Sequence, residues 1–162
     1  MEIQSLGSKY RNDVISFVDD EWGNPIVTKG NKIEIYDLPG FVAIENEKVV
    51  GAVLYQIFEK DCEIVAMYSL KQNTGIGTAL INAVISIAKD NSCNRVWLIT
   101  MNDNTHAIRF YQRRGFSLIN VYINAFKVTQ KIKGIPGTGV DNIVCGIDGI
   151  PILHEFEFEI IL

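Results

Sequence analysis

The sequence has few of the residues that usually build disulfide frameworks or metal sites. Three of its 162 residues are cysteines and two are histidines. Cys62, Cys93 and Cys145 are too widely spaced for a Cys-x-x-Cys metal motif, and an odd number cannot all pair within one chain. His106 and His154 lie far apart, and no third ligand follows a recognisable pattern. We therefore expect free thiols and no bound metal.

Long apolar runs and clustered positive charge are also missing. No stretch of about 18 apolar residues occurs, and residues 1–4 do not resemble a signal peptide, so we expect a cytoplasmic protein without a membrane partner. The 15 lysines and arginines are scattered and the formal net charge is -4, so we do not expect a nucleic-acid partner. Hydrophobic residues make up 48% of the chain, and we expect residues 1–162 to form a single domain.

The order of the apolar patterns predicts a mixed α/β fold. Three β-rich runs separated by short polar turns predict an antiparallel meander over residues 41–44, 49–58 and 62–69. A helical stripe at 80–88 precedes a nearly continuous apolar run at 95–100, which is typical of a central strand covered on both faces. This order predicts a right-handed crossover and a parallel pair of strands. The other expected elements are a first strand at 1–6, a helix near 8–18, a helix after 105, strand structure at 116–128, a long surface loop at 130–151 and a final strand at 155–160.

The third strand of the meander carries a carboxylate among apolar residues. Strict alternation predicts that one face of this strand presents Glu63, Val65, Met67 and Ser69. The opposite face then presents Ile64, Ala66 and Tyr68. Glu63 is either a functional carboxylate or a residue near the strand start whose side chain reaches solvent.

A glycine-bearing turn follows this strand and leads into the predicted helix. It consists of Gln72, Asn73, Thr74, Gly75, Ile76 and Gly77, and Thr78 follows it. Glycines let the backbone curl tightly, and a helix that begins there adds unpaired N–H groups and the positive end of its dipole. The turn is therefore a candidate phosphate site, but by itself it does not distinguish ATP, a dinucleotide or CoA from a plain helix-initiating turn. No Gly-Lys-Ser/Thr sequence follows, so it is not a P-loop.

A second motif follows the apolar run at 95–100. The pattern Asn-x-x-Ala-x-x-x-Tyr-x-x-x-Gly-Phe is matched by Asn104, Ala107, Tyr111, Gly115 and Phe116. Residues 72–77 match Gln/Arg-x-x-Gly-x-Gly/Ala. With both motifs in this order, the sequence resembles the GNAT superfamily of acetyl-CoA-dependent N-acetyltransferases. The resemblance extends over the whole chain and is weakest at 22–40 and 130–152.

The resemblance implies a GNAT fold, which is a mixed central sheet of about seven strands flanked by about four helices. That sheet is antiparallel except for a parallel pair at strands 4 and 5, which splay apart to admit the pantetheine arm of acetyl-CoA. The glycine turn then faces the pyrophosphate, while Asn104 either holds the pantetheine arm or only caps a helix. The resemblance assigns cofactor binding to Val65, Met67, Ser69, Gln72, Asn73, Thr74, Gly75, Ile76, Gly77, Thr78, Asn104 and Tyr111.

The same resemblance implies acetyl transfer to a primary amine by direct attack in a ternary complex. It places Tyr111 to protonate the departing thiolate, and a phenol with an ordinary pKa of about 10 suits that task. The alternative for Tyr111 is simple packing in the core. Glu63 is the candidate general base, because some GNAT enzymes carry a glutamate on this strand.

Two other functions remain open at this point. One is a non-catalytic acyl-CoA-binding or regulatory module on the same fold, and the other is a nucleotide-binding protein that uses the glycine turn. The acceptor, a small molecule or a protein amine, is not encoded in a recognisable motif. Acidic residues at 19–21, 34 and 37 would suit a cationic amine, although a solvated acidic surface accounts for them more simply. The alternating final strand fits a homodimer about as well as a monomer.

Overall fold

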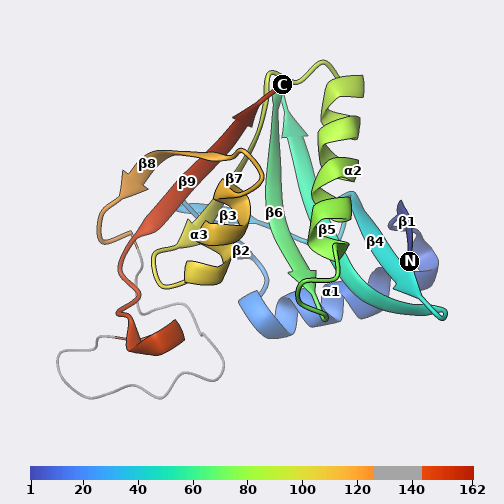
Figure 1. The fold of residues 1–162 in the computed structure, drawn as a ribbon, viewed down its shortest axis with the longest axis horizontal. Coiled ribbons are helices and arrows are strands. Elements are labelled where there is room, and N and C mark those ends of the chain that lie inside the picture. The colour runs from blue at the N-terminus through green and yellow to red at the C-terminus, as the bar shows by residue number, and fades with distance from the viewer. Residues whose placement is uncertain (126–143) are drawn as a thin grey trace.

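The computed structural model describes residues 1–125 and 144–162 of the chain. It contains a seven-stranded sheet in the order β1-β4-β5-β6-β7-β9-β8 and a separate hairpin of β2 and β3 (Figure 1). The strands are β1 (Glu2–Ser5), β2 (Ile26–Thr28), β3 (Asn31–Ile33), β4 (Gly40–Glu45), β5 (Lys48–Phe58), β6 (Asp61–Ser69), β7 (Arg95–Met101), β8 (Ser117–Tyr122) and β9 (Glu155–Ile161). The helices are α1 (Ser8–Trp22), α2 (Ile76–Asp90), α3 (Thr105–Gln112) and the short 3-10 helix η1 (Ile147–Gly149). No helix in this described part of the chain is both long and apolar enough to cross a membrane.

The predicted meander and crossover are both confirmed. β4, β5 and β6 pair antiparallel, and β6 and β7 pair in parallel on either side of the α2 crossover. In chain order these last two are strands 4 and 5 of the main sheet. The final strand β9 lies between β7 and β8 and is antiparallel to both. Residues 126–128 of the predicted strand region and 130–143 of the predicted loop lie outside the described residues.

The predicted count of about four helices is slightly high. Residues 1–125 and 144–162 contain three α-helices and η1. Between α1 and β4 the chain forms the β2–β3 hairpin instead of another helix. Gly23, Pro25 and Gly30 interrupt this stretch, and both glycines have positive φ angles.

Apolar side chains pack into two clusters, one on each face of the sheet. On β5, Val53 belongs to one cluster and its neighbours Ala52 and Leu54 to the other, as the alternation of a strand requires. α2 and α3 cover the first face, here called the α2 face. α1 covers the second face (Figure 1), and its buried residues are the predicted stripe of Tyr10, Val14, Ile15 and Val18.

The β2–β3 hairpin lies on the same face as α1, and we call this side the hairpin face. Ile26, the first residue of β2, and Ile35, which follows β3, pack in the same cluster as α1. Cover over β7 is nevertheless uneven, because Val96 and Leu98 are buried on the α2 face while Trp97 on the hairpin face is only half-buried. The prediction that this strand is covered on both faces is therefore right for one face only.

A β-bulge at Val65 changes which side chains share a face at the end of β6. Consecutive residues of β5 pair with Ala66 and Ile64, so Val65 between them has no partner. Ile64 and Met67 pack on the α2 face, whereas Val65 and Ala66 pack on the other. Strict alternation is thus wrong beyond this point, and Met67 does not share the face of Glu63. One extra residue shifts the phase of a pattern whose period is two.

We predict that the sheet depends on Phe158 for its stability and not on Phe58. Phe158 of β9 is fully buried in the α2-face cluster, whereas Phe58 at the end of β5 is 75% exposed. Phe158→Ala should lower the free energy of unfolding by about 3–5 kcal/mol because it leaves a cavity. The matched change Phe58→Ala should alter it by about 0.5 kcal/mol or less. Urea denaturation followed by circular dichroism measures both, and equal losses would contradict this account of the core.

Candidate functional site

The sheet opens between β6 and β7. Their parallel pairing ends at Ile64 and Leu98, although both strands continue further. From Val65 onward, the side of β6 that faces β7 therefore presents backbone groups without a strand partner among residues 1–125 and 144–162. The predicted edge residues Val65, Met67 and Ser69 all lie on this stretch. Such an edge can receive an extended ligand through main-chain hydrogen bonds.

The predicted glycine turn connects β6 to α2 through two residues with positive φ. Asn73 has φ 57°, and Gly75, the N-cap of α2, has φ 85°. The Thr74 hydroxyl donates to the carbonyl of Lys71 at 3.1 Å, which braces the turn. Because α2 begins at Ile76, the N–H groups of its first turn have no carbonyl four residues earlier in the helix. The turn and the helix dipole together suit an anion.

A close contact between α2 and α3 explains the second glycine of the turn. A Cβ atom at Gly77 would lie 2.8 Å from the ring of Phe110 in α3. The Arg114 guanidinium stacks on the same ring, 3.6 Å from its centroid. It also donates to the Thr78 hydroxyl from Nε at 2.9 Å and from Nη2 at 2.6 Å. The sequence analysis did not identify Arg114 as a site residue. The one sequence feature that could have indicated it is its position directly before Gly115 of the second motif.

Tyr111 lies in the core cluster on the α2 face. Its ring contacts those of Phe110, Phe116 and Phe158, with centroids 5.2, 5.5 and 6.5 Å away. Burial raises the pKa of the Tyr111 phenol, and the charge of Arg114 acts in the opposite direction. The Tyr111 ring therefore packs in the core, as the alternative to a catalytic role predicted. This packing fixes the ring in place. The phenol hydroxyl is the only group of Tyr111 that could exchange a proton with a ligand.

The second motif serves to hold Tyr111 on a short, well-capped helix. The Asn104 side chain accepts a hydrogen bond from the Ala107 N–H at 3.1 Å, so the N-cap alternative is correct for its carbonyl oxygen. Gly115 has φ 86°, which favours glycine after the helix ends. Phe116 then turns back onto Tyr111. Four of the motif residues thus have local structural roles beside any role in binding.

Glu63 is buried on the hairpin face and does not reach solvent as a strand-end residue would. It is 5% exposed, and its carboxylate accepts a hydrogen bond from Gln56 Nε2 at 2.7 Å. Burial raises the pKa of the Glu63 carboxyl, while Gln56, Lys29 and Thr28 act in the opposite direction. A buried carboxyl with a raised pKa in a partly polar setting is a candidate for proton transfer.

The two predicted catalytic residues lie on opposite faces of one sheet. Tyr111 packs with α2 and α3, whereas the partners of Glu63 include Thr28 and Lys29 of the hairpin. The opening between β6 and β7 begins next to Glu63, immediately beyond Ile64.

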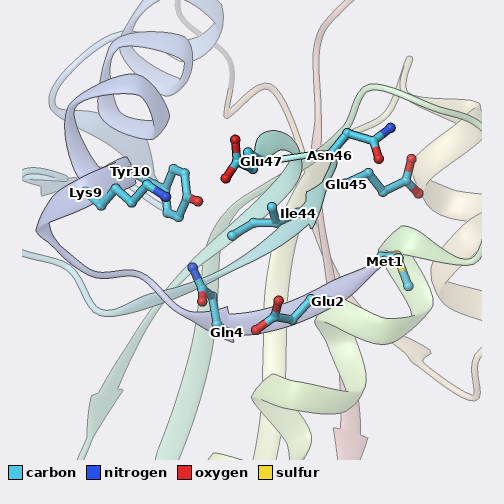
Figure 2. Close-up of a pocket in the computed structure, with 9 residues that line it drawn as sticks. All are labelled: Met1, Glu2, Gln4, Lys9, Tyr10, Ile44, Glu45, Asn46 and Glu47. Carbon is cyan, nitrogen blue, oxygen red and sulfur yellow. The ribbon is translucent and has the colours of Figure 1, made fainter.

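A cavity of about 340 Å³ opens beside Glu63. Its lining includes Trp97, the last residues of β5 with Gln56 among them, and the first residues of β6. Another cavity, of about 740 Å³, lies between β1, the start of α1 and the β4–β5 turn (Figure 2). None of the predicted site residues lines that cavity. It is lined by the carboxylates of Glu2, Glu45 and Glu47, whose negative charge does not suit a phosphate. In residues 1–125 and 144–162 no three histidine, cysteine, aspartate or glutamate side chains are grouped to hold a metal ion.

A family model matches more than half of this chain, and two relatives are similar to it over most of its length. The family model described as "Acetyltransferase (GNAT) family" matches residues 11–116. The Bacillus subtilis (strain 168) protein YxbD is 36% identical over 147 residues, which cover 89% of this chain and 92% of YxbD. YdhI of the same strain is 41% identical over 119 residues, which cover 72% of this chain and 74% of YdhI.

A solved structure shares the fold. It is a GNAT family acetyltransferase from Elizabethkingia anophelis with acetyl-CoA bound, and it superposes with a TM-score of 0.67 over 99% of this chain and 97% of that chain. Its sequence identity is 16%, so the likeness concerns the architecture and not individual side chains.

We predict that one glutamate of the native protein titrates at an unusually high pH and that this residue is Glu63. Burial disfavours its charged form, so its carboxyl should keep a proton at pH values where an ordinary glutamate has lost it. A carbon-13 NMR titration of glutamate-labelled protein should show this resonance, and Glu63→Gln should remove it. Gln56→Ala should raise the pKa further, because a hydrogen bond to the charged form is lost. If the high-pH resonance persists in Glu63→Gln, the assignment is wrong.

Proposed function

Because the chain belongs to the acetyltransferase (GNAT) family, we propose that it transfers the acetyl group of acetyl-CoA to a primary amine in a ternary complex. The observation that carries this proposal is the unpaired edge of β6 leading directly into the glycine turn. Acetyl-CoA has an extended amide-bearing arm followed by a pyrophosphate, which matches that order. ATP suits the turn but has no part that pairs with an extended backbone edge.

The cofactor would be held mainly by backbone groups of this chain. The edge from Val65 to Ser69 would pair with the amides of the pantetheine arm. N–H groups from Asn73 to Thr78 would face the pyrophosphate, with Gln72 at the entry of the turn. Arg114 would add positive charge there, because its guanidinium is already anchored on the Thr78 hydroxyl.

The transfer requires one proton to leave the amine and one to reach the sulfur. The amine nitrogen attacks the thioester carbonyl, a C–N bond forms and the C–S bond breaks. Glu63, directly or through a water, would take the amine proton on the hairpin face. Tyr111 would give its proton to the departing thiolate on the α2 face, although burial raises the pKa of this phenol and makes it a weaker proton donor than an ordinary tyrosine. A backbone N–H near Met67, beside the bulge, would polarise the carbonyl.

Calorimetry with acetyl-CoA and a thiol-release assay over a panel of amines test this proposal. We expect saturable binding of acetyl-CoA and release of CoA thiol only when an amine is present. Binding without thiol release over the whole panel would favour the non-catalytic module. Competition by ATP but not by CoA would favour the nucleotide-binding alternative.

Tyr111→Phe and Glu63→Gln should separate the two proton transfers. Tyr111→Phe should lower kcat about 100-fold and leave the Kd for acetyl-CoA within about twofold, because the packed ring remains and only the proton donor is lost. The kcat/KM of wild-type protein should fall as the pH decreases through the raised pKa of Glu63, and Glu63→Gln should remove that fall. Steady-state kinetics over a range of pH measure both. Unchanged turnover in Tyr111→Phe, or an unchanged acidic limb in Glu63→Gln, would remove that residue from the mechanism.

Arg114→Leu should weaken binding of acetyl-CoA about tenfold, whereas Arg113→Leu should have little effect. Arg114 lies beside the first turn of α2, and its exposed neighbour Arg113 supplies a matched control. A tenfold loss corresponds to about 1.4 kcal/mol, which is close to the lower end of what one hydrogen bond to a charged group contributes. S-acetyl-N-acetylcysteamine, a small thioester without phosphates, distinguishes a loss of phosphate binding from a loss of packing around Phe110. If Arg114→Leu impairs turnover of that thioester equally, Arg114 only supports the structure around Phe110.

A further inference from the structure

The turn of the β2–β3 hairpin places a lysine ammonium between two aromatic rings. Lys29 Nζ lies 4.6 Å from the centroid of the Trp97 ring and 5.3 Å from that of Tyr122. It also lies 3.2 Å from Oε2 of Glu157, a residue that is 4% exposed. The Lys29 N–H donates to Glu155 at 2.9 Å, which fixes the turn over β9. Trp97, Tyr122 and Glu157 thus form an ammonium cage, the arrangement that aromatic faces and a carboxylate make around a cation.

Neighbouring groups hold the carboxylate of this ammonium cage in position. The Tyr122 hydroxyl donates to Glu157 Oε2, and Arg95 Nη1 donates to Glu157 Oε1 at 3.3 Å. Arg95 also pairs with Asp61 and Glu159, so its charge is already shared among three carboxylates. If Lys29 left the ammonium cage, a buried carboxylate would remain with less compensation. That state costs free energy unless another cation enters.

The ammonium cage adjoins the candidate base. Trp97 is the partner of Glu63 in the register of β6 and β7, and both residues line the 340 Å³ cavity. The charge of Lys29 also acts on the Glu63 carboxyl. A molecule whose reacting amine lay at Glu63 would therefore have a cation site on the neighbouring strands.

We propose that the acetyl acceptor carries a second cationic group, as an alkyl diamine does, and that this group displaces Lys29 from the ammonium cage. Lys29 is then a tethered occupant that fills the cage while no acceptor is bound. This inference rests on the proposed acetyl transfer and adds the class of acceptor to it.

The ammonium cage is an anchor and not the position of the reacting amine. Partial burial works against the charge of Lys29, but hydrogen bonds and charge interactions with Tyr122 and Glu157 outweigh it and raise the pKa of the ammonium. An amine held there keeps its proton and has no lone pair with which to attack a thioester. The second amine, nearer to Glu63, is the one that can be deprotonated.

Lys29→Met tests the inference, and Lys32→Met on the exposed part of the same hairpin is the matched control. Thiol release from acetyl-CoA is measured with diaminobutane and with butylamine, which has a single amine. Wild-type protein should have the higher kcat/KM for diaminobutane. Lys29→Met should lower the KM for diaminobutane about tenfold, because no tethered ammonium competes for the cage, and should change the KM for butylamine less than about twofold. Lys32→Met should change neither.

Glu157→Gln and Trp97→Leu provide the reverse test. Each should raise the KM for diaminobutane about tenfold and leave the affinity for acetyl-CoA unchanged in calorimetry. Thermal unfolding identifies a variant that fails to fold, and the other variant then carries the test. Equal kcat/KM for the two amines in wild-type protein, or an equal effect of Lys29→Met on the two KM values, overturns the inference and leaves acetyl transfer standing.

Failure of the proposed function has a different signature. If acetyl-CoA shows no saturable binding, acetyl transfer is wrong, and direct calorimetric titration of diaminobutane into Lys29→Met tests the ammonium cage by itself. Tighter binding of diaminobutane than of butylamine supports the cage as a cation site. Equal binding overturns it.

Discussion

The end of pairing between β6 and β7 at Ile64 and Leu98 is the constraint on which the site depends. Backbone groups inside a sheet are normally satisfied by the next strand, and leaving them open costs free energy unless water or a ligand takes that place. Here the unpaired stretch begins at the Val65 bulge and runs toward the glycine turn. An open edge in the middle of the sheet is therefore followed in the chain by the positive end of α2.

The position of α3 gives the site its second component. Gly77 lets Phe110 approach the first turn of α2, and Arg114 is held between this ring and Thr78. The same helix carries Tyr111 into the apolar cluster of the α2 face. One packing contact thus sets a cation beside the glycine turn, and the same helix fixes the Tyr111 ring in the core. The pKa of the Tyr111 phenol is raised because the packing that fixes the ring also removes it from water.

The opposite face of the sheet has a different character. α1 and the hairpin cover an apolar cluster over part of it, whereas paired charges lie beside Trp97 of β7 and Glu157 of β9. Glu63 is buried among polar partners there, and Lys29 is held by Glu157 and two aromatic rings. Both faces of the sheet thus carry an apolar cluster, and the paired charges of the hairpin face lie around Glu63 and Glu157.

The sequence by itself determined the order of the elements, the parallel pair, the glycine turn and the helix that carries Tyr111. These depend on local signals, namely apolar periodicity, glycines and caps within a few residues of one another. Only the tertiary structure decided the bulge at Val65, the contact of Arg114 with Thr78 and the enclosure of Lys29. The bulge is invisible to a pattern of period two, because one extra residue leaves the composition of the strand unchanged. Lys29 and Glu157 are 128 residues apart, so no local pattern relates them, and they meet only because the hairpin and β9 fold onto the same face of the sheet.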